Sequence, residues 1–449
     1  MKIIIYSCNV ATFDSEHFEI TSFPSCKQQW DITTNLFFEH DIVIVTTLPG
    51  RFLIDYKANN IIEKSKKIIY KLIPPLPPEE IANLIIEYKP DIAIAASFWT
   101  NNIDWLSLQD SIVAEKLQQM KIKTICPSIN TSLTCLDKNR FKIFLQARNF
   151  QTPNFLYVHH QLFRKERGQK DIKINPYREF IFNEMKKMNF PIIIKDSMGF
   201  SSNGLEVIKT VNQGTTFLDS KRNNSDRIIE EYISGIQFGV EIYGYSNFYT
   251  IMPPFMLSVN KYGITCPKQG LKIGPITNSK FKLDELNKIL EKLAQELNFE
   301  GITQVDLIFN ETGWHIIEVN TRISGMSSSY VTALEINLPT LLMQLATKTK
   351  IKEQLKNILS IKTPIISKSS FEKLTKIKEI KYLNQNYNLN AKQEREKGFC
   401  EIIFSGNETF EQLISLSEKV LRKNLSQELS DKDFDEIFYS LSQMTTVLS

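Results

Sequence analysis

The sequence predicts an α/β protein of several domains, and three observations lead to this prediction. Short β-branched segments with almost no charge recur within the first 130 residues. A helical pattern lies between two of them. The chain has 449 residues, of which 42% are hydrophobic and 23% charged. This composition is typical of globular proteins, and the length is sufficient for roughly three domains.

The N-terminal elements indicate a parallel sheet. The candidate strands are Lys2–Ser7, Asp41–Thr47 and Asp91–Ser97. Each is apolar enough to be covered by other elements on both faces. Between the last two, prolines precede a helix with apolar residues such as Ile81 and Ile85 at helical spacing. No GxGxxG follows the first strand, so a dinucleotide-binding domain is not indicated.

The later elements are mixed. Thr131 to Arg148 predicts a helix that opens near Asp137, and Phe281 to Leu297 predicts a strongly amphipathic helix. A polar segment rich in Lys and Asn, Lys348 to Lys397, separates this part from a final strand and helix. A capping box that begins at Thr409 marks the start of the final helix.

The overall charge and cysteine content exclude several classes of function. The formal net charge is +4, too small for its length to predict a nucleic-acid partner or an anionic membrane surface. No apolar run reaches the length of a membrane span, and the N-terminus lacks a signal-peptide core. The six cysteines form no CxxC pair. We therefore expect a cytoplasmic protein without disulfides, zinc, membrane or nucleic-acid partners.

The most informative segment runs from Gly301 to Gly325. A turn signal at Asn310 to Gly313 separates two β-rich runs, which predicts a hairpin. Pairing the two runs across this turn places Asp306 opposite Glu318 and Gln304 opposite Asn320. Period-two alternation then assigns these four side chains, with Arg322, to one face. The other face carries Val305, Leu307, Phe309, Ile317 and Val319.

Two opposed carboxylates repel each other unless a cation lies between them or one is protonated. The oxygen donors of Asp306, Glu318 and Asn320 are of the kind that Mg²⁺ accepts together with substrate phosphates. The alternative is a hairpin face whose charges are solvated by water. The hairpin pattern alone does not distinguish this alternative from a Mg²⁺ site.

A second motif favours the metal. Only 16 residues are glycine, so a loop with two of them is informative. The segment Phe190 to Ile208 reads as a strand ending in Lys195, a Ser/Gly/Asn loop and a second strand. Such a loop can turn backbone N–H groups and hydroxyls toward phosphate oxygens. The loop residues concerned are Ser197, Gly199, Ser201, Ser202 and Gly204. A polar hairpin turn remains the alternative.

Taken in order, four segments resemble the ATP-grasp superfamily, from about Thr131 to Thr347. They are LDKNRFKIFLQARNFQTPNF, FPIIIKDSMGFSSNG, IIEEYISG, and QVDLIF with IIEVNTR. The resemblance implies that Lys138 and Lys195 are the two nucleotide lysines. It also implies that the Ser/Gly loop, including Ser197, Ser201, Ser202 and Gly204, covers the phosphates of ATP.

The same resemblance assigns the remaining site residues. Glu230 and the backbone of Glu231 and Ile233 would meet the adenine base. Gln237 stands where the family usually has a glutamate for the ribose hydroxyls, so altered ribose contacts are expected. Asp306, Glu318 and Asn320 would be the Mg²⁺ ligands. Arg322, acting in catalysis with Lys195, would contact the transferring phosphate or the reaction intermediate.

The resemblance also implies a domain organisation. Residues 1–130 would form the preceding α/β domain, residues 131–347 the ATP-grasp core with a mobile lid at about 155–232, and residues 348–449 a small α+β module that completes the enzyme. The expected fold class is therefore α/β, an ATP-grasp fold with a parallel α/β domain before it.

The implied reaction is the ATP-dependent joining of a small-molecule carboxylate and an amine through an acyl phosphate, with ATP and Mg²⁺ as cofactors. Amino acids or small peptides are the expected substrates, and a homodimer is left open. The alternatives are a biotin-carboxylase-like or other ATP-grasp ligase, and a nucleotide-binding regulatory protein without turnover. Biotin carboxylases carry a glutamate and a histidine where this chain reads ISGMSSS after Arg322. Four further residues have two interpretations, substrate contact or ordinary solvation and packing: Trp99, Trp105, Lys268 and Lys272.

Overall fold

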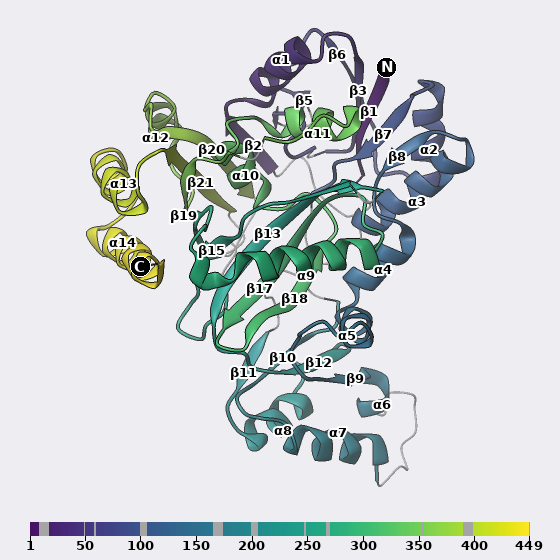
Figure 1. The fold of residues 1–449 in the computed structure, drawn as a ribbon, viewed down its shortest axis with the longest axis vertical. Helices are drawn as coiled ribbons and strands as arrows, with labels where there is room; N and C mark the ends of the chain where they lie inside the picture. Colours follow the sequence, from purple (N-terminus) through teal and green to yellow (C-terminus); the bar gives the residue numbers. More distant parts are fainter. Residues whose placement is uncertain are drawn as a thin grey trace.

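The computed structural model describes residues 1–8, 18–48, 50–57, 60–98, 106–164, 174–198, 205–246, 248–265, 270–352, 354–388 and 398–448. Figure 1 shows an upper part built from the N-terminal, central and C-terminal segments, with a smaller unit below it. Among the helices that the structure describes, none has the length and hydropathy needed to span a bilayer.

The N-terminal region contains the expected parallel sheet, with strand order β6-β3-β1-β7-β8. Its strands are β1 Lys2–Ser7, β3 Asp41–Thr46, β6 Ile68–Leu72, β7 Ile92–Ala95 and β8 Lys123–Ile125, and its helices are α1 Cys26–Leu36, α2 Pro78–Glu87 and α3 Leu106–Gln119. The three predicted strands are confirmed. They are buried because apolar residues from other elements cover both faces of the sheet.

The helix predicted from Thr131 to Arg148 is two helices, α4 Ile129–Leu136 and α5 Lys138–Ala147. Asp137 breaks the helical path with φ −93° and ψ 109°, and its side chain accepts the backbone N–H of Asn139 at 2.9 Å. The break makes Lys138 the first residue of the capped helix α5.

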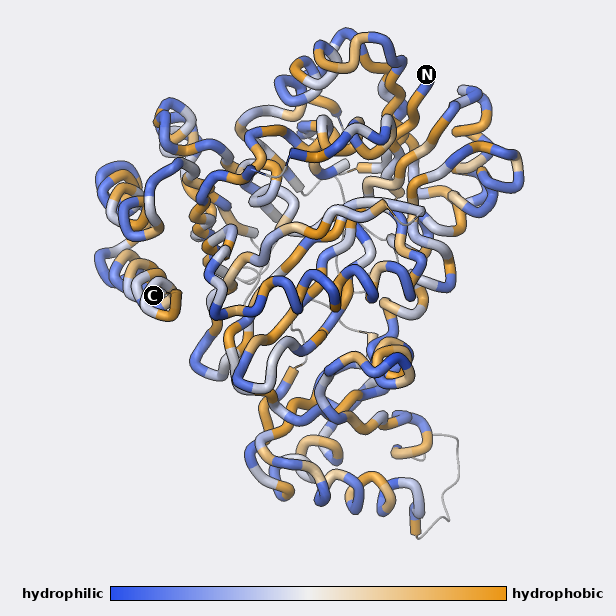
Figure 2. The backbone as a smooth tube through the Cα atoms, viewed as in Figure 1, coloured by the Kyte–Doolittle hydropathy of each residue, from blue (hydrophilic) through white to orange (hydrophobic). Residues whose placement is uncertain are grey.

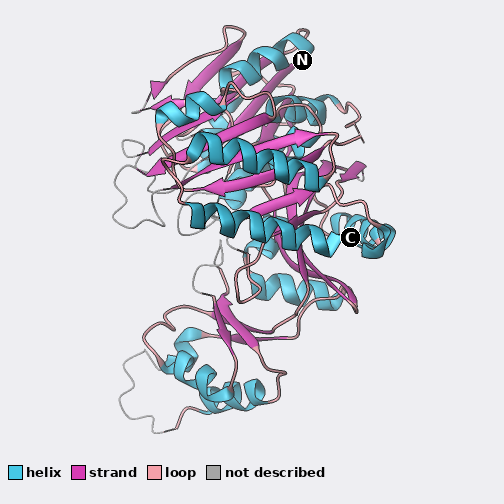
Figure 3. Cartoon of the chain, turned by 90° about the vertical axis from the view of Figure 1, so that its left-hand side faces the viewer, coloured by secondary structure: helices cyan, strands magenta, loops and turns pink. Residues whose placement is uncertain are grey.

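Residues 155–231 form the smaller unit at the bottom of Figure 1, which Figure 3 shows from the side. Its antiparallel sheet has the order β11-β10-β12-β9. The elements are β9 Phe155–Val158, α6 His160–Arg164, α7 Pro176–Lys186, β10 Ile192–Asp196, β11 Glu206–Ile208, α8 Val211–Asp219 and β12 Arg227–Glu231. The unit has its own apolar core. Its extent agrees with the predicted lid, whose mobility stays a prediction.

A sheet of 12 strands among the described residues forms the centre, with the path β18-β17-β13-β15-β16-β19-β21-β20-β2-β4-β5 and β14 beside β13. The strands are β2 Phe18–Phe23, β4 Tyr56–Lys57, β5 Asn60–Ile61, β13 Ile236–Tyr245, β14 Phe248–Ile251, β15 Phe255–Leu257, β16 Leu271–Gly274, β17 Gly301–Asn310, β18 Gly313–Asn320, β19 Asn357–Thr363, β20 Ile380–Asn388 and β21 Gly398–Gly406. The helices after β16 are η2 Ser279–Phe281, α9 Leu283–Glu296, α10 Ser327–Ala333, α11 Leu338–Thr347, α12 Lys368–Leu374, α13 Phe410–Leu425 and α14 Asp431–Leu448.

The polar segment Lys348 to Lys397 is not a mere separator, as its composition suggested. It supplies β19 and β20, which join β21 to the central sheet, and β20 pairs onward with β2 from the N-terminal region. The three predicted domains remain a prediction, but one continuous sheet contains strands from all three ranges.

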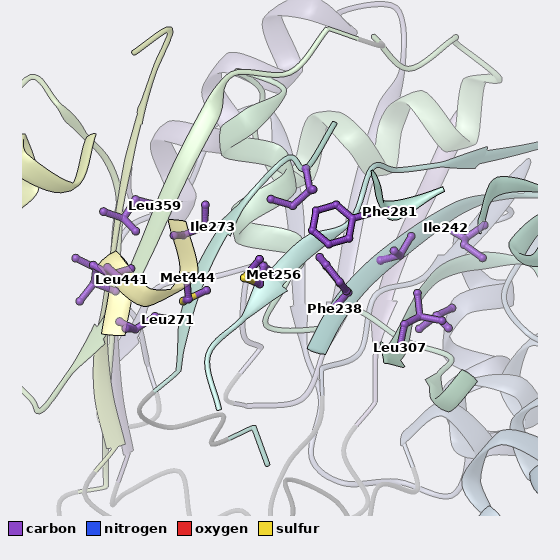
Figure 4. Packing of buried hydrophobic residues seen from close by; sticks show 14 of the residues in the cluster. Phe238, Ile242, Met256, Leu271, Ile273, Phe281, Leu307, Leu359, Leu441 and Met444 are labelled. Carbon is purple, nitrogen blue, oxygen red and sulfur yellow. The ribbon is translucent and has the colours of Figure 1, made fainter. Parts of the chain in front are cut away.

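The central core lies between the sheet and its covering helices. In Figure 2, α9 alternates between hydrophobic and hydrophilic residues, as the predicted amphipathic helix requires. Figure 4 shows Leu441 and Met444 of α14 beside Leu271 of β16, with Phe238 and Phe281 further along the same core. The C-terminal helices therefore help to fix the strands that line the site.

Candidate functional site

A cavity of about 260 Å³ lies where the N-terminal, central and C-terminal segments meet. Arg51, Phe52 and Phe98 line it from the N-terminal region, and Lys362, Phe399 and Glu401 from the C-terminal strands. The central segment contributes ten of the residues considered below: Lys138, Lys195, Gln237, Lys272, Gln304, Asp306, Ile317, Glu318, Asn320 and Arg322. Seven of the fourteen site residues predicted from the sequence thus share one cavity.

The predicted hairpin and its register are confirmed. Strands β17 and β18 are antiparallel, with Asp306 opposite Glu318 and Gln304 opposite Asn320. The turn closes with Asn310 opposite Gly313, whose φ of 110° suits glycine. All four polar side chains of the paired positions line the cavity.

One side chain of the hairpin was assigned to the wrong face. A register irregularity between Asp306 and Leu307 pairs Leu307 with Ile316, so Ile316 enters the core and Ile317 lines the cavity. A β-bulge inserts one extra residue and so reverses the alternation on its strand. Simple period-two counting could not have revealed it.

The carboxyl of Asp306 shows the effect of the charge opposite it. Burial and the nearby Glu318 charge raise the pKa of Asp306 to about 7, although Gln304 donates to its Oδ1 at 2.7 Å and Arg322 and Lys138 favour its ionised form. A divalent cation would relieve this repulsion.

The donor set fits Mg²⁺. The predicted set comprises two carboxylates, Asp306 and Glu318, and the amide of Asn320. Within the described part of the chain, no group of three or more His, Cys, Asp and Glu side chains could hold a metal. The predicted set is sufficient for Mg²⁺, which keeps several waters and takes other ligands from substrate phosphates.

Two cations flank the carboxylates. Lys138, at the start of α5, has its Nζ 3.4 Å from Oε1 of Glu318. Arg322 follows the end of β18 and donates through Nη2 to Oδ1 of Asn320 at 3.3 Å. Both line the cavity, so two positive groups face the edge where the metal ligands are predicted.

A buried ion triad holds the second predicted lysine. Lys195 Nζ is 2.9 Å from Oε2 of Glu230, and the fully buried Lys142 has its Nζ 3.3 Å from the other oxygen of that carboxylate. Burial alone would raise the pKa of Glu230, but the two lysines outweigh it and lower that pKa. Burial also lowers the pKa of Lys142 to about 8.

The triad changes the interpretation of Glu230. Its carboxylate, predicted to meet adenine, is 2% exposed and occupied by the two lysines, so its observed contacts orient Lys195 instead. Lys142 was missed. Its spacing of four residues from Lys138, on the same helical face, was the available signal.

The hinge between β12 and β13 was predicted to meet adenine through backbone groups of Glu231 and Ile233. The Glu231 side chain accepts from Asn154 Nδ2 and Asn189 Nδ2, each at 2.9 Å, and its own N–H binds Asn154 O at 3.0 Å. Neither hinge residue is among the described residues that line the cavity. Their nucleotide role therefore stays a prediction.

Gln237 does line the cavity, and its Nε2 donates to Gly263 O at 3.4 Å. This contact does not test whether Gln237 binds the ribose, so that role stays a prediction.

Only the start of the predicted phosphate loop lies in the described chain. Ser197 is buried, donates from Oγ to Asp137 Oδ1 at 2.8 Å, and accepts the Lys138 backbone N–H at 3.0 Å. Its hydroxyl thus ties the chain just after the lid strand β10 to Asp137 at the start of α5, and its phosphate role stays a prediction. Ser201, Ser202 and Gly204 lie outside the described residues.

Lys272 is neither solvated nor isolated, although solvation was one of its two interpretations. It is 6% exposed, and its Nζ lies 2.8 Å from Oε1 of Glu401. Lys268, Trp99 and Trp105 fall outside the described residues.

Comparison with known proteins identifies the fold. Residues 135–326 match the family described as "ATP-grasp domain". D-alanine--D-alanine ligase B of Clostridium perfringens is 25% identical over 206 residues, which cover 45% of this chain and 62% of that protein. Carbamoyl-phosphate synthase of Methanobrevibacter smithii is 22% identical over 219 residues, 47% of this chain and 54% of that protein. The chain thus spans little more than half the length of these two relatives.

Solved structures resemble the whole chain. L-amino acid ligase from Bacillus licheniformis has a TM-score of 0.63 at 14% identity and covers 94% of this chain and 97% of its own. N5-carboxyaminoimidazole ribonucleotide synthetase from Thermus thermophilus has a TM-score of 0.62 at 11% identity, with 96% and 99% covered. The expected ATP-grasp fold is therefore confirmed.

Proposed function

We propose, from the premise that this chain is a member of the ATP-grasp superfamily, that it is an ATP-dependent carboxylate–amine ligase acting on amino acids or small peptides. One observation carries the proposal: the opposed carboxylates Asp306 and Glu318 share a cavity with Lys138 and Arg322. Catalytic phosphoryl transfer between two anions needs this combination of metal ligands and fixed cations.

In the first step, a carboxylate oxygen of the acid substrate forms a bond to the γ-phosphorus of ATP, and the bond from that phosphorus to the bridging oxygen of ADP breaks. Negative charge develops on the transferring group and on ADP. Arg322, just after β18, and Lys138, at the start of α5, stabilise this charge. Bound Mg²⁺, held by Asp306, Glu318 and Asn320, would neutralise phosphate charge.

In the second step, the amine attacks the carbonyl carbon of the acyl phosphate. A C–N bond forms, the C–O bond to phosphate breaks, and the amine loses a proton to solvent. The products are an amide, ADP and inorganic phosphate. The planar guanidinium of Arg322 can hold two oxygens of the tetrahedral intermediate at once, which the ammonium of a lysine cannot.

Lys195 is assigned to the nucleotide phosphates. Its contact with the buried carboxylate of Glu230 at 2.9 Å fixes the ammonium at the edge of the cavity. Lys142 lies on the other oxygen of Glu230 and takes no direct part. The triad therefore supports Lys195 as a positioned phosphate ligand.

The test is ADP release by the purified chain with MgATP and pairwise mixtures of L-amino acids, with products identified by mass spectrometry. Amine-dependent ADP release with an amide product supports the ligase. Nucleotide binding without ADP release under any mixture would support the regulatory alternative instead.

The carboxylase alternative is tested separately with bicarbonate and biotin. The ISGMSSS sequence lacks the glutamate and histidine that biotin carboxylases carry, so we expect no carboxybiotin. A homodimer and a cytoplasmic location stay predictions, which size-exclusion chromatography and cell fractionation would check.

A further inference from the structure

A second group of charges lines the same cavity, and the proposed reaction has not used it. Lys362 and Glu401 are cross-strand partners on β19 and β21, and Glu401 is paired in turn with Asn384 on β20. Arg51, from the N-terminal region, donates through Nη2 to Asn384 Oδ1 at 3.0 Å. Together with Lys272, this group has three cations and one carboxylate.

The single carboxylate is already committed. Glu401 accepts from Lys272 Nζ and Ser360 Oγ, each at 2.8 Å on Oε1, and from Ser328 Oγ at 3.3 Å on Oε2. Burial would raise the pKa of Glu401, but Lys272 and Lys362 outweigh it and lower that pKa. Glu401 therefore balances one cation, and the group keeps a net positive charge.

Arg51 and Lys362 are surrounded by aromatic rings. The Arg51 guanidinium carbon lies 4.6 Å from the ring centroid of Phe98, 5.3 Å from Phe52 and 5.8 Å from Phe399. Lys362 Nζ lies 4.6 Å from the Phe399 centroid. All five residues line the cavity.

The Arg51 cation is costly in this apolar setting, because its buried Nε has no hydrogen-bond partner. Burial lowers the pKa of Lys362 to about 7, although Glu401 favours its charged form. Buried charge is tolerated when an opposite charge compensates it. A planar guanidinium beside an ammonium is suited to a carboxylate.

The distance to the reaction centre suits a small molecule. Lys272 Nζ donates to Gly325 O, and Gly325 is three residues after Arg322. Three residues span at most ~10 Å, so this cationic group begins within that distance of the Arg322 backbone. The acid substrate must bind beside Arg322 for phosphoryl transfer, so this neighbouring group is available to the other substrate.

We propose that Arg51 and Lys362 bind the carboxylate of the amine-bearing co-substrate, an amino acid whose apolar side chain packs against Phe52, Phe98 and Phe399. This inference rests on the proposed ligase function. It assigns an apolar amino acid to the amine site and makes these residues determinants of specificity.

The experiment compares wild type with Arg51→Met and Lys362→Met, with Lys381→Met as the matched control. Lys381 is an exposed lysine of β20 that contacts only Lys378 O among the contacts described for it. Each protein receives MgATP and an equimolar mixture of the 20 proteinogenic L-amino acids, with or without hydroxylamine. Hydroxylamine has no carboxylate and traps acyl phosphate as a hydroxamate, so it reports acid activation alone.

We expect Arg51→Met and Lys362→Met to lower dipeptide formation about 30-fold or more, as loss of one partner of a buried charge pair does. Hydroxamate formation should stay within about twofold, because it needs no second carboxylate. Wild type should also prefer free amino acids to amino-acid amides as the amine, and both variants should lose this preference. Arg51→Lys, which retains the charge, should restore part of it, and this excludes general misfolding as the cause.

Equal loss of dipeptide and hydroxamate would assign the subsite to the acid substrate and overturn the inference. Unchanged dipeptide formation in both variants would also overturn it. A wild-type protein that forms neither product refutes the proposed ligase function itself, which is a distinct outcome.

Discussion

Replacing Asp306 by asparagine should stabilise the protein when Mg²⁺ is absent and destroy its activity. The substitution keeps the size of the side chain and an oxygen that can accept the hydrogen bond from Gln304, observed at 2.7 Å. It removes the charge that faces Glu318 across the hairpin. The same change removes a predicted metal ligand, so turnover should be abolished.

The magnitude follows from the pKa of Asp306, which burial and Glu318 raise to about 7. Compared with an ordinary aspartate near 3.9, this corresponds to an upper limit of ~4 kcal/mol. Asp306 lines a cavity and is only partly buried, so solvent screening reduces this limit and we expect a gain of ~1–2 kcal/mol for Asp306→Asn. An unfolding midpoint about 2–5 °C higher should result.

The pH dependence has a definite sign. Between pH ~4 and ~7 the unfolded chain releases this proton while the native protein retains it, so the wild-type protein loses stability as pH rises through that window. The advantage of Asp306→Asn should therefore be complete at pH 8 and smaller at pH 5. Glu311→Gln, which removes an exposed charge from the turn of the same hairpin, is the control and should show no such pH dependence.

The assay is thermal unfolding in EDTA at both pH values, repeated with MgADP. Bound MgADP should raise the midpoint of wild type more than that of Asp306→Asn. A variant that melts below wild type at pH 8 in EDTA, or that gains as much from MgADP, would refute the assignment of Asp306.

Three further substitutions test the surrounding residues. Arg322→Lys should lower kcat roughly 10²-fold or more, by analogy with loss of an oxyanion donor, and leave MgADP affinity in calorimetry unchanged; a defect confined to nucleotide binding would contradict this role. Glu230→Gln should lower the free energy of unfolding in urea by ~3–5 kcal/mol, because Lys142 and Lys195 lose their buried counter-ion; a change near zero would argue against the triad. Glu241→Gln should alter stability by less than ~1 kcal/mol near pH 7, since burial raises the pKa of this carboxyl to about 7 and glutamine can accept the same hydroxyls.

The sequence was most informative where local chemistry determines structure. The hairpin register followed from a turn signal and period-two alternation, because a slip of one residue would expose the apolar face. Helix α13 was predicted from its capping box, which is observed at Thr409, whereas α14 after it was not predicted. These features depend on residues close together in the chain.

The sequence was least informative where residues far apart in the chain come into contact. The strand β20 was hidden because its asparagines resemble a linker, yet its burial comes from pairing with β21 and β2. Lys142 was overlooked for a similar reason, since its counter-ion Glu230 is far away in the sequence. The contacts of Arg51 likewise arise only when the N-terminal segment reaches β20.

Two groups of charged residues in the cavity differ in their carboxylates, and this difference orients the proposed reaction. At the hairpin, the opposed Asp306 and Glu318 are paired with cations and would share a divalent cation with nucleotide phosphates. In the other group, the one carboxylate, Glu401, already accepts from Lys272, while Arg51 and Lys362 line the cavity beside aromatic rings. Under the proposed function, the nucleotide would therefore bind at the hairpin and the amino acid at the second group.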